Sequence, residues 1–215
     1  MSLIQIEVQY GYARCAVDTR ITRAQVPDLP TPEASKLCAI PHAGCVTAGR
    51  GGIAAFWTLN SLILRMPSLH DFDSIVEGMS GMVDWLAHNI QIPTDGFDSV
   101  IEVFLLGWSD AARRMNASRF EIDLRNNRCE RTPVGQRLIT PPWPRDCRYG
   151  FHGLATDDAM LEVAQQQLQW MTENVPADAT GGRLLVAEVT RHEIRLHDAG
   201  PISGHGSTGP NAQVA

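Results

Sequence analysis

The sequence predicts an α+β protein in which antiparallel β-sheets are covered by helices. Near both ends of the chain, apolar residues alternate with polar ones, which is typical of strands with a buried face. Between these segments, apolar residues recur every three or four positions, which is typical of amphipathic helices. Hairpins of strands followed by pairs of helices favour a layered sandwich.

The chain opens with a predicted hairpin. Residues 4–10 alternate apolar and polar side chains, and Gly11 breaks the run. A second strand is predicted from Tyr12 to Asp18. We expect one face of the first strand to be buried, and we expect the hairpin to bring the amino terminus back towards Asp18.

A second hairpin and two helices are predicted next. The apolar segments 36–40 and 45–48 flank a Pro-His-Ala-Gly turn. From about Arg50 to Met66 the pattern is helical and largely apolar, so we expect this helix to be mostly buried and to end before Pro67. Residues 68–89 follow the spacing of an amphipathic helix whose acidic face meets water.

The second half returns to strands and adds one helix. Residues 101–108 form a nearly continuous apolar run, residues 120–124 alternate, and Asn126-Asn127 supplies a turn. A third helix is predicted to begin near Thr156, whose hydroxyl can cap it. A last hairpin covers 183–189 and 193–197. We therefore expect a single domain over residues 1–198 and a disordered Gly/Ser/Pro-rich tail over 199–215.

Composition narrows the class of protein. The chain has 215 residues, enough for one full core, and 18 basic against 24 acidic side chains give a net charge of −6. We therefore expect no nucleic-acid partner. The longest uncharged apolar stretch, Gly51 to Leu64, is shorter than the roughly 20 residues that a membrane helix needs. No basic segment or cleavage site of a signal peptide is visible at the start, so we expect a cytoplasmic protein without a membrane partner.

The cysteines and histidines suggest neither a metal site nor a cofactor. The five cysteines form no C-x-x-C pair, which favours buried free thiols in a reducing compartment over disulfides or zinc. The histidines show no H-E-x-x-H spacing, and His42 and His152 lie in turn-like sequence. We expect no metal and no cofactor.

The start of the chain offers a candidate nucleophile. Ser2 follows the initiator Met1, and a small residue there usually allows the methionine to be removed. The mature chain would then begin with a serine that carries both a hydroxyl and a free α-amine. An α-amine has a pKa of about 7.7–8.0, so it can accept the hydroxyl proton near neutral pH.

The spacing of further residues resembles the β-type subunits of proteasomes and the related bacterial ATP-dependent peptidase, which are amino-terminal-nucleophile hydrolases. In that family the nucleophile is followed by an A-D-T-R-x-T-like segment, here 17–22, and then by a strand lysine, here Lys36. An A-G-x-[GA] turn opens a helix, here Ala48 to Gly51 before Phe56-Trp57. The resemblance covers roughly residues 2–108 and implies a four-layer αββα sandwich.

The resemblance implies a role for each matched residue. Ser2 would attack the carbonyl carbon, Lys36 would lower the hydroxyl's pKa, and Asp18 would keep Lys36 charged. The N–H of Gly49 would stabilise the oxyanion. The residues implied in substrate binding, by strand addition along the cleft, are Arg20, Thr22 and Gly51.

Two departures from the family keep alternatives open. The family usually has threonine as its nucleophile, and its G-S-G-like turn before the third helix is not apparent here. The leading hypothesis is a proteasome-like hydrolase of peptide or amide bonds that forms a homo-oligomeric ring and works with an ATP-dependent unfoldase. One alternative is an inactive homologue that serves as a ring or scaffold subunit, and another is a small-molecule amidase of the same superfamily.

Overall fold

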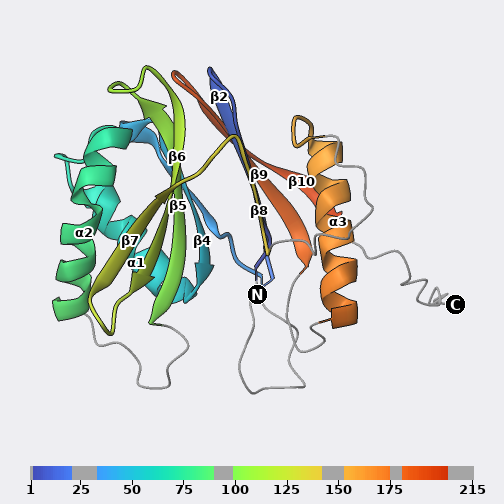
Figure 1. Ribbon diagram of the computed structural model, residues 1–215, viewed down its shortest axis with the longest axis horizontal. Coiled ribbons are helices and arrows are strands. Elements are labelled where there is room, and N and C mark those ends of the chain that lie inside the picture. Colours follow the sequence, from blue (N-terminus) through green and yellow to red (C-terminus); the bar gives the residue numbers. More distant parts are fainter. Residues whose placement is uncertain (1, 21–32, 90–98, 142–152, 175–180, 203–215) are drawn as a thin grey trace, which may run out of the picture.

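The computed structural model describes residues 2–20, 33–89, 99–141, 153–174 and 181–202 (Figure 1). The strands in these ranges are β1 (Ile4–Val8), β2 (Tyr12–Asp18), β3 (Leu37–Ile40), β4 (Cys45–Gly51), β5 (Val100–Ser109), β6 (Arg114–Asp123), β7 (Arg128–Pro133), β8 (Arg137–Thr140), β9 (Gly182–Thr190) and β10 (Ile194–Ile202). The α-helices are α1 (Ile53–Arg65), α2 (Phe72–Asn89) and α3 (Asp157–Asn174), and Pro41–Ala43 form a short 3-10 turn.

The strands form two antiparallel sheets, so the predicted α+β class is confirmed. Sheet I has the order β10-β9-β2-β1-β8, and sheet II has the order β3-β4-β5-β6-β7. Figure 1 shows the two sheets facing each other, with α1 and α2 outside sheet II and α3 outside sheet I. Burial of one face of each helix and of the facing sides of both sheets explains this arrangement.

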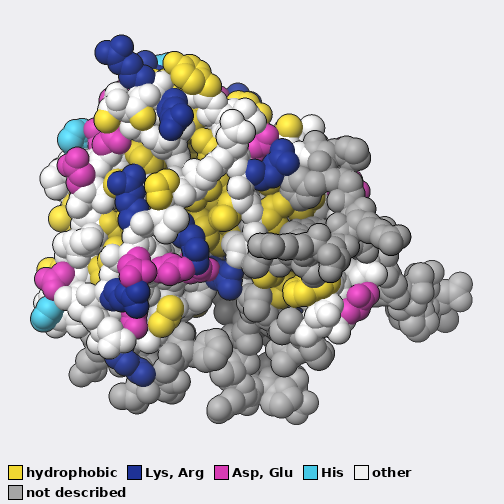
Figure 2. Space-filling view, viewed as in Figure 1, with side chains coloured by type: hydrophobic (Ala, Val, Ile, Leu, Met, Phe, Trp, Pro, Cys, Tyr) yellow, Lys and Arg dark blue, Asp and Glu magenta, His cyan; other side chains and the backbone are white. Residues whose placement is uncertain are grey.

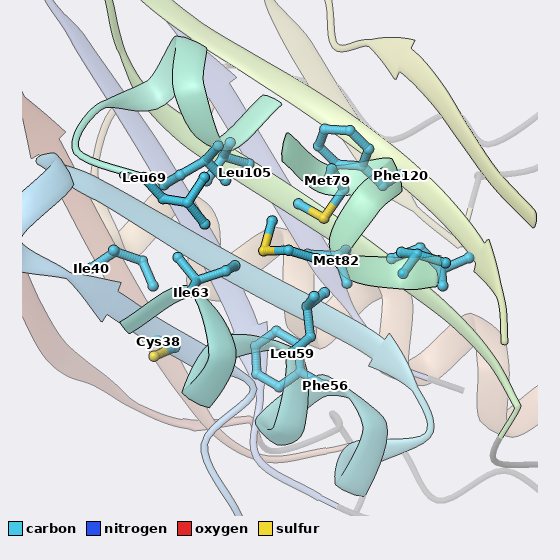
Figure 3. Packing of buried hydrophobic residues seen from close by; sticks show 14 of the residues in the cluster. Cys38, Ile40, Phe56, Leu59, Ile63, Leu69, Met79, Met82, Leu105 and Phe120 are labelled. Atoms are coloured by element: carbon cyan, nitrogen blue, oxygen red, sulfur yellow. The ribbon is translucent and has the colours of Figure 1, made fainter. Parts of the chain in front are cut away.

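Three groups of buried apolar side chains hold these elements together. Ile4, Ile6 and Phe104 belong to the group between the sheets. Met160 of α3 packs against sheet I. In the group between sheet II and its helices, side chains of α1 and α2, including Phe56, converge on the strands (Figure 3).

The first strand is buried on both faces, which corrects the prediction of a single buried face. Its apolar residues face the inter-sheet core, yet the polar Gln5 and Glu7 are only 0% and 4% exposed. The Nε2 of Gln5 donates to Oε1 of Gln167 in α3 at 3.1 Å, and the N–H of Leu154 donates to Glu7 at 2.9 Å. Polar partners in and before α3 make this burial tolerable.

Helix α1 differs from its prediction in start and burial. Arg50 and Gly51 continue β4, where they pair with Glu102 and Ile101 of β5, so the helix begins only at Ile53. Trp57 and Leu64 are 38% and 44% exposed, because sheet II covers only one side of the helix. The expectation that this helix is mostly buried was therefore wrong for its outward face.

The other two helices follow their predicted apolar stripes. Helix α2 begins at Phe72 and not at Ser68, because Asp71 caps it: the N–H of Ser74 donates to Oδ1 of Asp71 at 2.7 Å. Helix α3 begins after Thr156, whose Oγ1 accepts the N–H of Ala159 at 3.2 Å. The predicted cap of α3 is confirmed.

Two strands, β7 and β8, were not predicted, and β10 is longer than predicted. The short strands β7 and β8 carry too few apolar residues to have been recognised. The turn at Asn126-Asn127 is confirmed, with Asn127 in the left-handed region at φ 48°. Strand β10 continues to Ile202, beyond the boundary predicted at residue 198. The rest of the predicted tail lies outside the described residues.

The described cysteines are free thiols, as predicted. Cys15, Cys38 and Cys45 are buried and Cys129 is partly buried, whereas Cys147 lies outside the described residues. Burial raises the pKa of all four described thiols. His42 contacts the carbonyl oxygen of Leu69 at 3.0 Å, which fits its predicted place in a turn.

Candidate active site

The predicted site residues meet where several strands begin or end. Asp18 is the last residue of β2 in sheet I, and Lys36 directly precedes β3 in sheet II. Ser2 lies just before β1, the neighbour of β2. The facing arrangement of the two sheets therefore brings together residues that are far apart in the sequence.

Lys36 and Asp18 form a buried ion pair. The Nζ of Lys36 donates to Oδ1 of Asp18 at 2.9 Å and to the carbonyl oxygen of Arg20 at 2.5 Å. Lys36 is 5% exposed and Asp18 is 0% exposed. Burial raises the pKa of Asp18, whereas the ammonium of Lys36 and the N–H groups of Leu3 and Gly181 act to lower it.

The same carboxylate holds the start of the chain. The N–H of Leu3 donates to Oδ1 of Asp18 at 2.9 Å, and the N–H of Asp18 donates to the carbonyl oxygen of Leu3 at 3.4 Å. Ser2 is 7% exposed. Because Leu3 and Lys36 share one acceptor oxygen, Ser2 lies next to the residue pair that was predicted to assist it. Met1 lies outside the described residues.

Gly49 and Gly51 each have a structural reason to be glycine. A Cβ on Gly49 would lie 2.3 Å from the ring of Phe56, and one on Gly51, at φ +97°, would lie 2.5 Å from the carbonyl oxygen of Val100. The N–H of Gly49 donates to the carbonyl oxygen of Lys36 at 2.9 Å. In this structure the predicted oxyanion donor therefore already has an acceptor.

Arg20 lies beside this group, and Thr22 lies outside the described residues. The N–H of Arg20 donates to the carbonyl oxygen of Gly181 at 3.2 Å, and its own carbonyl oxygen accepts from Lys36. A β-bridge to Glu33 holds the backbone of Arg20 from the other side. These contacts fix the backbone of Arg20 next to the ion pair.

The sequence interpretation missed the contribution of Gly181 and Gly182. The N–H of Gly181 donates to Oδ2 of Asp18 at 3.3 Å, so both carboxylate oxygens have partners. Both glycines have positive φ, and a Cβ on Gly182 would lie 2.5 Å from Oγ1 of Thr19. A Gly-Gly pair at the start of a strand was the sequence signal that could have identified this position.

Within the described ranges, no group of three or more His, Cys, Asp or Glu side chains could hold a metal ion. No helix among the described residues is long and apolar enough to span a bilayer. What the described residues do bring together is a buried cation, a buried carboxylate and the start of the chain. The cation of this pair can lower the pKa of an adjacent hydroxyl or ammonium group, and the carboxylate keeps the cation charged.

Comparison with solved structures identifies the class of fold. No family model matches the chain, and no curated protein matches it in sequence. The fold is similar to that of Anbu (ancestral beta-subunit) from Yersinia bercovieri, with a TM-score of 0.58 at 14% identity over 93% of this chain and 87% of that chain. The chain thus has the proteasome-like fold predicted from its sequence. At this identity the similarity establishes the fold alone.

Proposed function

We propose that this protein is a proteasome-like amino-terminal-nucleophile hydrolase that cleaves peptide or amide bonds with Ser2 after Met1 is removed. The observation that carries this proposal is the shared acceptor: Asp18 Oδ1 accepts both the ammonium of Lys36 and the N–H of Leu3. The helices outside both sheets also fit the four-layer αββα architecture of that superfamily.

The proposed reaction uses the two groups of one residue. The α-amine of Ser2 accepts the hydroxyl proton while Oγ bonds to the carbonyl carbon of the substrate. The resulting tetrahedral intermediate breaks its C–N bond, and the ammonium returns the proton to the leaving nitrogen. Water then attacks the acyl ester, with the amine again as base, and releases the acid and Ser2.

Lys36 and Asp18 would set the protonation states in this step. The positive charge of Lys36 favours both the ionised hydroxyl and the neutral amine of Ser2. Asp18 keeps Lys36 charged inside the protein, and Gly181 and Leu3 hold the carboxylate in place. Arg20, Thr22 and Gly51 are proposed to line the cleft for an extended substrate.

One observation favours the alternative of a catalytically inactive subunit. The N–H of Gly49 has to leave the carbonyl oxygen of Lys36 before it can stabilise an oxyanion. In a homologue that only assembles into rings, the N–H of Gly49 could stay bonded to Lys36. In either case we propose a cytoplasmic homo-oligomeric ring, and for the enzyme also an ATP-dependent unfoldase that supplies substrate.

The proposal is tested by measuring the intact mass of the native protein before and after treatment with a peptide epoxyketone. This reagent reacts with an amine and a hydroxyl together. We expect the mass of the chain without Met1, and one adduct that is absent in Ser2→Ala. The variant Ser61→Ala, which removes an exposed hydroxyl of α1, should keep the adduct. A retained Met1 without an adduct would leave the inactive subunit as the better account, and light scattering would then test the ring.

A further inference from the structure

A recess lies at the end of the sandwich opposite the candidate active site. Strands β3 and β9 begin beside the Lys36–Asp18 pair, and the recess is formed where they end. Its walls are the turn that follows β3, Trp108 near the end of β5, and the tip of the β9–β10 hairpin. The pocket has a volume of about 800 Å³, which is large enough for several side chains of a ligand.

The pocket lies between two strands that are at the edges of their sheets. Strand β3 is at one edge of sheet II, and β10 is at one edge of sheet I. Ala39 of β3 and both Ile194 and Leu196 of β10 line the pocket, and Leu196 is 49% exposed. Edge strands offer backbone donors and acceptors to an additional extended segment, and the apolar side chains offer it a surface.

One wall of the pocket already binds a guanidinium group of this chain. The guanidinium carbon of Arg191 lies 4.9 Å from the ring centroid of Trp108, which is the geometry of a cation–π contact. The Nε1 of Trp108 donates to Oδ1 of Asp110 at 2.9 Å, and the same oxygen lies 3.7 Å from the guanidinium of Arg191. An indole face and a carboxylate are therefore arranged together as a receptor for a cation.

The remaining charges of the pocket are mostly acidic. Asp71 and Glu193 also line it, so three carboxylates face one guanidinium. Glu193 is paired with Arg195 outside the pocket at 2.7 Å. The N–H of Ser74 donates to Oδ1 of Asp71 and lowers the pKa of this carboxyl, and Nε2 of His70 lies 3.5 Å from its other oxygen. Because Asp110 lies opposite Arg191 and Glu193 is paired with Arg195, Asp71 is the carboxylate that is left to attract a basic ligand.

We propose that this pocket binds an extended peptide segment of a partner protein in which basic side chains alternate with apolar ones. The apolar side chains of the segment pack on Ile194 and Leu196. One basic side chain takes the position of Arg191 between Trp108 and Asp110, and another pairs with Asp71. This role is independent of hydrolysis at Ser2.

Fluorescence anisotropy with a labelled synthetic peptide of sequence Leu-Arg-Leu-Arg-Leu tests the proposal. The full-length Ser2→Ala protein is used, so that a failure of binding is distinct from a failure of catalysis. We expect saturable binding that weakens as salt increases, and at least tenfold weaker binding of a peptide with Glu in place of Arg. Absence of binding at millimolar peptide, or equal binding of the two peptides, would overturn the proposal.

Variants of the pocket locate the bound peptide. Asp71→Asn combined with Asp110→Asn should weaken binding about tenfold or more. The control is Glu77→Gln combined with Asp84→Asn, which removes the same charge from the exposed face of α2. This control should leave binding unchanged. Arg191→Ala should strengthen binding at least threefold, because it removes the internal competitor for Trp108. If the α2 variant weakens binding as much as the pocket variant, or Arg191→Ala has no effect, the peptide does not occupy this pocket.

Discussion

Lys36 donates to Asp18 at 2.9 Å in a part of the molecule from which solvent is almost excluded. Asp18 ends β2 of sheet I and Lys36 directly precedes β3 of sheet II, so their pairing links the two sheets at one end of the sandwich. The same carboxylate holds the chain start and the Gly181 segment. The pair is thus a structural link as well as the centre of the candidate active site.

Removing one member of this pair should be strongly destabilising. Lys36→Met leaves the carboxylate of Asp18 buried without its cation, and we expect a loss of about 3–5 kcal/mol in the free energy of unfolding measured with urea. Replacing both residues, as in Asp18→Leu with Lys36→Met, should restore part of that loss because no buried charge is left. A single Lys36→Met variant as stable as the parent would contradict the buried ion pair.

Gly49→Ala should destabilise the fold whether or not the protein is an enzyme. The added methyl would lie 2.3 Å from the ring of Phe56, and overpacking of this kind costs about 1–3 kcal/mol. Gly81→Ala is the matched control. Gly81 lies on the exposed side of α2 with no atom near its Cβ position, so alanine there should stabilise by roughly 0.5–1 kcal/mol. Thermal denaturation followed by circular dichroism gives the melting temperature of both variants. Equal changes in melting temperature would argue against the close approach of α1 to β4.

Arg14 should anchor the start of α3 to sheet I. It is 4% exposed, forms ion pairs with Asp157 and with Glu188, and is the cross-strand neighbour of Glu7. In Arg14→Met, Asp157 and Glu188 lose this cation, but their side chains are 39% and 37% exposed and water compensates in part, so we expect a loss of about 1–3 kcal/mol. Hydrogen exchange should accelerate first at the amide of Leu154, which donates to Glu7.

Arg195→Met is the control for Arg14. It removes the same charge from strand β10 of the same sheet, but the side chain of Arg195 is 65% exposed, so the change should be within about 1 kcal/mol. Similar losses for the two variants would contradict the proposed anchor.

The buried thiols should make the protein less stable in alkali. Burial, with smaller effects of Asp71 and Asp73, raises the pKa of Cys45 from its usual 9.0 to about 12. Above pH 9 the unfolded chain loses this proton while the native protein keeps it. Stability is therefore fully present below pH 9 and decreases towards pH 12, by at most about 1.4 kcal/mol per pH unit for this thiol. The free energy of unfolding, measured with urea at increasing pH, should fall less steeply with pH in Cys45→Ala than in the parent protein. An equally steep fall would contradict the raised pKa of Cys45.

Local patterns were sufficient to predict most of the elements but not which of their faces are covered. Alternation predicted β1, and the apolar spacing predicted α2 and α3. The burial of Gln5 and Glu7 was not predictable, because α3, which covers them, is distant in the sequence. The exposure of Trp57 was not predictable either, because the apolar pattern of a helix does not show which of its apolar side chains the sheet covers.

The sequence by itself determined the order and type of the main elements, since periodicity is a property of the chain alone. Its resemblance to a known family singled out Ser2, Asp18, Lys36 and Gly49 as candidate site residues. Only the tertiary structure decided that Asp18 accepts from both Lys36 and Leu3, that Gly181 completes its contacts, and that the N–H of Gly49 already has an acceptor. Hydrogen bonds between distant segments depend on how two sheets pack, and a linear pattern carries no record of that packing.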